Sequence, residues 1–222
     1  MFVLCCVVIV PAQERVMEKA EFDKMLADGN SHRLKWAGEK YRMIVTTSSK
    51  AIGRPQTDYS SKMIIEHGPS TETRIVNTSV FGANPATTFE SIRLGNWLYT
   101  RSGGGTWTRK EYAASAASKE NDEAEYPVLS SKAEYKYIGE GKLIDKRVQI
   151  FSATERTTRI NNKTGETWET DSKITYWVDE KGLILKSDYT GDNRRKVPSQ
   201  TSVIMEWQLD PSITITAPEI AP

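Results

Sequence analysis

Apolar and polar positions alternate along most of the chain with a period of two. In the segment 41–48 the odd positions hold Tyr, Met, Val and Thr, and the even positions hold Arg, Ile, Thr and Ser. Successive side chains of a β-strand point to opposite faces, so this period predicts strands. Similar segments rich in β-branched and aromatic residues predict strands over 41–47, 62–66, 73–80, 91–101, 107–111, 135–139, 146–158, 167–178, 183–189 and 202–209.

Short polar segments containing Gly or Asn separate several of these strands. Residues 102–105 read Ser-Gly-Gly-Gly, residues 161–165 read Asn-Asn-Lys-Thr-Gly, and residues 179–182 read Asp-Glu-Lys-Gly. Gly and Asn tolerate the positive φ of tight turns, so these segments indicate antiparallel hairpins. The sequence therefore predicts a mainly β protein.

One segment has a helical period instead. From Glu14 to Asp28 apolar residues recur at spacings of three and four, and Gly29 and Asn30 then provide a stop signal. We expect this helix to cover part of the sheet. Its apolar face would consist of Val16, Met17, Ala20, Phe22, Met25 and Leu26.

The segment 112–127 interrupts the strand pattern. It is rich in Ala, Ser, Lys, Glu and Asp, which is too polar for a core strand and favours a solvated crossing loop. The alternative is a lid over a cavity, because insertions between the strands of an open barrel often lie at its mouth. In both cases we expect residues 113–126 to be the most mobile part of the protein.

The N-terminal ten residues form an unbroken apolar run, and the small residues Val10 and Ala12 suit the −3 and −1 positions of a signal peptidase site. This predicts an export signal over residues 1–12 and a single mature domain over 13–222. No cation precedes Phe2, which leaves a truncated start or a buried amphipathic start open. Spanning a bilayer takes about 20 apolar residues, so we expect no transmembrane span.

Both cysteines, Cys5 and Cys6, lie inside the expected signal. A mature chain without them has no disulfide and no cysteine metal site. A lipid anchor would need a small residue before the modified cysteine, whereas Leu4 precedes Cys5. We therefore expect a soluble product in the periplasm or outside the cell.

Charge and composition exclude several other functions. The chain has 30 basic and 29 acidic side chains, interleaved along its length, which argues against a nucleic-acid partner. Its two histidines, His32 and His67, have no partner at metal-ligand spacing. There is no Gly-x-Ser-x-Gly turn, and the carboxylate pairs at 122–123 and 179–180 fall in polar loops or turns. We expect no catalytic site, no metal and no cofactor.

Aromatic residues offer the remaining candidate site. All six Trp residues fall on or beside predicted strands, where core packing is their ordinary role. The alternative is an apolar cavity for an acyl chain, whose shape the flexible Met side chain can follow. Trp97 and Tyr99 are two residues apart and should share one face of the sheet. The candidate cavity residues are Met43, Val45, Met63, Ile65, Trp97, Tyr99 and Trp107.

The order of these segments resembles one known superfamily. The resemblance rests on the N-terminal helix, Tyr41–Thr47, Gly95–Tyr99, the hairpin Tyr176–Leu183 and the end segment Asp210–Pro218. Together they look like a divergent member of the outer-membrane lipoprotein carrier and sorting superfamily, which is LolA-like and LppX-like. The resemblance implies a single half-open, curved antiparallel β-barrel whose concave face carries the N-terminal helix and short helical or lid segments.

The same resemblance implies a non-catalytic carrier. Members of the superfamily place an Arg after a Pro-containing turn, where it holds the lid, and Arg74 after Gly68-Pro69 is the nearest match here. The expected partner is a lipid or an acylated lipoprotein. The alternative is an envelope-associated module that binds protein or senses stress with the same fold. A hydrolase is a third and weaker interpretation.

Overall fold

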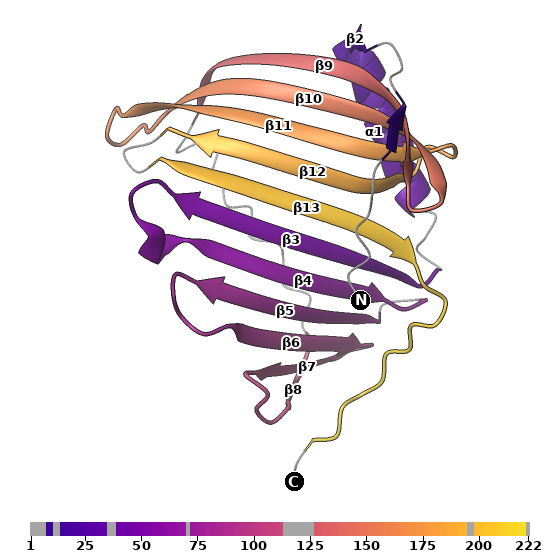
Figure 1. Ribbon diagram of the computed structural model, residues 1–222. Coiled ribbons are helices and arrows are strands. Elements are labelled where there is room, and N and C mark those ends of the chain that lie inside the picture. The colour runs from indigo at the N-terminus through magenta and orange to yellow at the C-terminus, as the bar shows by residue number, and fades with distance from the viewer. Residues whose placement is uncertain are drawn as a thin grey trace.

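The computed structural model describes residues 8–10, 14–34, 39–69, 72–112, 127–194 and 198–220. In this part of the chain, thirteen strands form a single antiparallel sheet (Figure 1). The strands are β1 (Val8–Val10), β2 (Arg15–Met17), β3 (Tyr41–Ala51), β4 (Tyr59–His67), β5 (Thr73–Phe81), β6 (Thr87–Leu94), β7 (Trp97–Ser102), β8 (Thr108–Glu111), β9 (Val128–Leu143), β10 (Lys146–Ile160), β11 (Thr167–Asp179), β12 (Ile184–Asn193) and β13 (Ser199–Leu209).

The sheet consists of two runs of consecutive hairpins. One run is β3 to β8, the other is β9 to β13, and β13 joins them by pairing with β3 along its whole length. β1 and β2 pair with β9 at one edge, and among the described strands β8 pairs with β7 alone at the other edge. The sheet curves but does not close (Figure 1). This confirms the expected mainly β, half-open antiparallel fold.

Glycine turns separate the strands where the sequence indicated hairpins. Gly182 has φ +80°, and Asp179 Oδ1 accepts hydrogen bonds from the backbone N–H groups of Lys181 and Leu183 in the same turn. One turn differs from expectation, because Gly95 (φ +55°) and Asn96 divide the strand predicted over 91–101 into β6 and β7. A glycine at positive φ followed by Asn is a hairpin signal in its own right.

The predicted helix also has different bounds. Helix α1 covers Lys19–Leu34, while residues 15–17 form strand β2 on the edge of β9. The open edge of β9 offers unpaired backbone groups, which explains why these residues pair as a strand. The helix continues through Gly29 and Asn30, because a single Gly inside a helix costs only about 1 kcal/mol.

Helix α1 packs across one face of β9 to β12 (Figure 1). Phe22 is only 3% exposed, and its ring centroid lies 4.9 Å from that of Tyr135 and 6.0 Å from that of Tyr176. Met17, Phe151 and Val178 complete this buried cluster. We call this side of the sheet the helix face.

The C-terminal segment packs on the opposite side. After β13 the chain passes the ends of β3 to β7 (Figure 1), and Ile213 and Ile215 are buried against Ile92 of β6 and Tyr99 of β7. We call this side the tail face. A third buried cluster lies near the ends of β9, β10, β12 and β13, and its members are Leu143, Val148, Ile150, Leu183, Leu185 and Trp207.

Candidate functional site

Strand register assigns each candidate residue to one face, because directly paired residues in a sheet point to the same side. Starting from Tyr176 under the helix, one row of paired residues crosses six strands from β11 to β5. The row continues to Phe89 on β6. Its members are Tyr176, Ser187, Met205, Val45, Met63, Asn77 and Phe89. Val45 and Met63 therefore lie on the helix face.

The neighbouring row on the same face is also apolar. Met43 pairs with Ile65, and Ile65 pairs with Ile75. The two rows form an apolar surface beside the helix-covered cluster, which we call the apolar wall; it consists of Met43, Val45, Met63, Ile65, Ile75 and Met205. Only Val45 is buried, and the others are half-buried. Phe89, at the end of the first row, is 43% exposed.

The aromatic candidates lie on the tail face instead. Tyr99 pairs with Ile92, which pairs with Arg74, and Leu94 pairs with Trp97. Tyr99 is 7% exposed and packs against Ile213 and Ile215. Trp97 is 42% exposed, and the guanidinium of Arg109 stacks 4.6 Å from its ring centroid. Trp107 packs against the Ile213 cluster, and Arg101 stacks on its ring.

The seven predicted cavity residues consequently do not form one wall. Met43, Val45, Met63 and Ile65 share the helix face, while Trp97, Tyr99 and Trp107 belong to the other side. The physical reason is the two-residue turn at Gly95 and Asn96, which sets the register of β7 against β6. A register change of one residue moves a whole strand's side chains to the opposite face.

Arg74 belongs to a chain of ion pairs across the tail face. It lies 3.6 Å from Glu66 and 3.6 Å from Glu90. Glu66 also pairs with Arg42 at 2.7 Å, and Arg42 reaches Asp210 at the start of the tail at 3.2 Å. At the other end of this chain of ion pairs, Arg101 pairs with Glu90 at 2.5 Å. The described contacts of Arg74 are thus cross-strand ion pairs, and the expected lid at 113–126 lies outside the described residues.

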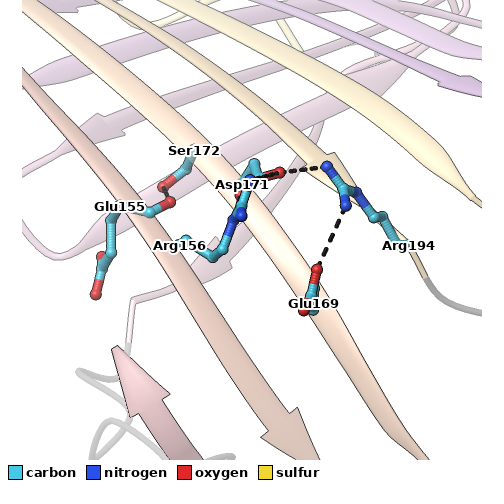
Figure 2. A network of polar contacts seen from close by, with 6 residues as sticks. All are labelled: Glu155, Arg156, Glu169, Asp171, Ser172 and Arg194. Atoms are coloured by element: carbon cyan, nitrogen blue, oxygen red, sulfur yellow. Dashed lines mark hydrogen bonds and ion pairs between the residues drawn. The ribbon is translucent and has the colours of Figure 1, made fainter. Parts of the chain in front are cut away.

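A second polar network occupies the same face over β10 to β12. Figure 2 shows Arg156 on β10 and Arg194, just after the end of β12, reaching Asp171 from either side. Asp171 Oδ1 accepts from Arg156 Nε at 2.5 Å, and Asp171 Oδ2 accepts from Arg194 at 2.5 Å. The hydrogen bond from Arg156 lowers the pKa of Asp171 from its usual value. Glu169 supplies a further contact to Arg194 at 3.3 Å.

This network borders a hollow of about 470 Å³. Its lining includes Lys132, Glu134, Arg156, Asp171, Lys173 and Asp192, together with hydroxyl groups of Thr154 and Thr190. Burying charged groups of this kind against a hydrocarbon chain is unfavourable. The hollow is therefore a poor fit for an acyl chain, unlike the apolar wall on the helix face.

Two polar groups on the helix face were not anticipated from the sequence. Asn77 Oδ1 and Arg93 Nε are buried, and neither has a hydrogen-bond partner among the residues described. Arg93 lies on the helix face because it belongs to the row of paired residues Tyr41, His67, Thr73 and Arg93. Its guanidinium lies 4.1 Å from the ring centroid of Tyr112. Alternation along β6 puts the side chain of Arg93 on the other side of the sheet from Glu90 and Ile92. Only the pairing register shows that this side is the helix face.

No cluster of three or more potential metal ligands occurs among the described residues. His67 stacks on Tyr41 with ring centroids 4.4 Å apart, and burial lowers the pKa of His67. His32 lies in a part of α1 whose side chains are outside the description. Within the described segments, none of the helical structure combines the length and apolar character that crossing a bilayer takes.

Comparisons with known proteins show a structural likeness but no family. No family model matches the chain, and no curated protein does so significantly. Among solved structures, the chain is similar to the crystal structure of a DUF1329 family protein from Desulfovibrio piger. The two share 13% sequence identity with a TM-score of 0.28, over 86% of this chain and 95% of the other.

Proposed function

We propose that the protein is a non-catalytic carrier that binds an acyl chain against the apolar wall on the helix face. The observation that supports this proposal is the register, which brings three Met side chains and three branched aliphatic ones together on β13, β3, β4 and β5. Most of this wall is only half-buried. An incompletely covered apolar surface on an otherwise polar protein is typical of a binding site.

The energetics suit an acyl chain. Each CH₂ group removed from water contributes about 0.8 kcal/mol, so a chain can bind without specific polar contacts. Met43, Met63 and Met205 can adjust their thioether side chains to ligands of varied shape. In this proposal α1, which packs on the same face over β9 to β12, forms one border of the site.

The cellular setting is part of the same proposal. An apolar carrier is useful where lipid must cross water, and the apolar run at residues 1–10 favours export to the periplasm or the medium. The cargo would be a free lipid or an acylated lipoprotein. An envelope protein that docks on the same wall is the alternative partner.

Binding of a fluorescent fatty-acid probe by purified protein tests the proposal. Met63→Gln keeps the volume of the side chain but adds an amide to the wall, and we expect it to weaken probe binding about tenfold, because an unpaired buried amide costs roughly 1–3 kcal/mol. Lys62→Gln is the matched control, since Lys62 is exposed on the tail face of the same strand.

Equal binding by both variants would contradict a site on the helix face. Native mass spectrometry of protein purified without detergent adds an independent readout. Reproducible lipid masses on the parent protein support a carrier. A protein that stays empty, binds no probe and retains an envelope protein would replace the carrier by the interaction module.

A further inference from the structure

The helix face has an unusual distribution of charge next to the apolar wall. Throughout β3–β8 and β11–β13, every Asp and Glu within a strand points to the tail face by register. These residues are Glu66, Glu90, Glu111, Glu169, Asp171, Asp179, Asp188, Asp192 and Glu206. The wall is therefore bordered by strands whose helix-face side chains carry no negative charge.

Cations are present on the same face, at the end of the wall nearest β8. Thr73 pairs with Arg93, Arg93 with Leu98, and Leu98 with Lys110. Arg93 is the diagonal neighbour of Ile75, which pairs with the adjacent Ser91, so it begins roughly 7 Å from the wall. A cationic residue thus occupies the strand position diagonal to the wall, with its guanidinium at the ring of Tyr112.

Arg93 lacks a charge partner within the described part of the chain. Its stacking on Tyr112 is the contact that the structure provides, and its Nε is buried without an acceptor. The tail face is the opposite case, since Arg42, Arg74 and Arg101 there each pair with a carboxylate. A buried guanidinium nitrogen without an acceptor among the described residues, such as Arg93 Nε, is unfavourable, and a nearby anion would offset part of that cost.

We infer that the ligand of the apolar wall is an anionic amphiphile with a carboxylate head group, held by Arg93. This inference rests on the proposed function and adds the head-group chemistry to it. Arginine binds a carboxylate through two parallel N–H···O bonds. A single guanidinium matches a single negative charge, whereas a phosphomonoester carries about −1.5 to −2 near pH 7. The chain of the ligand then extends from Arg93 over Ile75 and Ile65 towards Met205.

Competition with an uncharged polarity-sensitive dye tests this assignment on the mature protein. The competitors are oleate, its methyl ester, which has the same chain without charge, and the lysophosphatidate with the same chain. We expect oleate to bind about tenfold more tightly than the ester, which corresponds to one charge-assisted hydrogen bond. We also expect oleate to bind more tightly than the lysophosphatidate.

Variants at position 93 identify the residue responsible. Arg93→Gln should reduce the preference for oleate over the ester to within about twofold, and Arg93→Lys, which keeps the charge, should restore part of it. Arg109→Gln is the control, because Arg109 is an exposed arginine of the neighbouring strand β8 on the tail face. It should bind like the parent.

The possible failures separate the two proposals. Equal binding of oleate and ester by the parent overturns the head-group assignment and leaves the carrier intact. An oleate preference that survives in Arg93→Gln overturns the role of Arg93. Tighter binding of the lysophosphatidate overturns the choice of carboxylate. Displacement by none of the three competitors counts against the carrier itself.

Discussion

The two faces of the sheet differ in whether their charged side chains form ion pairs. On the tail face, arginines and carboxylates alternate from Asp210 to Arg101, so that each charge has a neighbour of opposite sign. On the helix face, the strands that carry the apolar wall have no carboxylate, and Arg93 stands beside them without an ion pair in the described chain. The charges of the tail-face chain are thus paired with one another, whereas the proposed ligand would supply the missing negative charge on the helix face.

Coverage differs between the faces as well. The helix face is covered over β9 to β12 by α1, and the tail face is covered over β6 and β7 by the C-terminal segment. Each cover is attached by a few buried side chains at one place. The wall on β3, β4, β5 and β13 lies between the helix-covered part of its face and the Arg93 end, and its half-buried side chains mark it as the open part.

The largest effect should come from removing the anchor of α1. Phe22→Ala deletes a ring that is 3% exposed and contacts Tyr135 and Tyr176, so we expect the free energy of unfolding to fall by about 3–5 kcal/mol. Chemical denaturation monitored by circular dichroism measures this. Lys24→Ala, at an exposed position of the same helix, is the control. A loss below about 1 kcal/mol would mean that the helix is not a structural part of the helix face.

Shortening the anchor of the tail should have a somewhat smaller effect. Ile213→Ala removes a side chain that is 5% exposed against Ile92 and Tyr99, and we expect a loss of about 2–4 kcal/mol in the free energy of unfolding. Probe binding at the helix face should not change, since the two covers lie on opposite sides. Thr214→Ala, exposed between the two isoleucines, serves as the reference. Loss of probe binding in a folded Ile213→Ala protein would show that the faces are coupled.

Acidification should weaken the Arg93 end of the helix face. Burial lowers the pKa of His67, so the unfolded chain binds the proton more readily than the folded protein. Stability is then fully present above about pH 6.5, the ordinary value for His, and decreases as the pH falls below it. His67→Phe keeps the stacking on Tyr41 and should flatten melting temperatures between pH 7.5 and 5.5. An unchanged slope in that variant would assign the pH response to other groups.

The smallest expected effect is the most direct test of the face assignment. Trp97→Asp places a charge at a position that is 42% exposed on the tail face, beside the cationic Arg109. We expect a folded protein that binds the fatty-acid probe like the parent. A folded Trp97→Asp protein that has lost probe binding would bring Trp97 back to the cavity and reverse the comparison between the faces.

The sequence was sufficient for the fold class but not for the site. Alternation over 41–48 and the glycine turns predicted antiparallel strands, because these signals are local in the sequence. The structure confirms these strands and turns. The face of a strand depends on its partner's register, which alternation does not contain. Treating 91–101 as one strand concealed the turn at Gly95, so the sequence could not show that Trp97 and Tyr99 lie on the opposite face from Met43 and Val45.

The same limitation explains the residues that were missed. Met205 and Ile75 belong to the wall only because β13 pairs with β3 and β5 pairs with β4. In the sequence Arg93 cannot be told from any other arginine on a strand. Only the pairing register shows that the strands β3–β8 have no carboxylate on its face. The predicted start of the helix was wrong for a related reason, because residues 15–17 pair with the edge of β9 instead of joining the helix.

The pairing of β13 with β3 has a consequence for how the protein acquires its structure. Every other pairing among β3 to β13 joins strands that follow each other in the chain, whereas Tyr41 must meet Leu209 from the other end of it. Closing so long a loop delays a contact, because chain entropy opposes it until other contacts compensate. The two hairpin runs can therefore form early and separately, and the seam between them forms last. Until translation delivers residues 199–209, the edge of β3 stays unpaired, and an unpaired strand edge favours association with other chains.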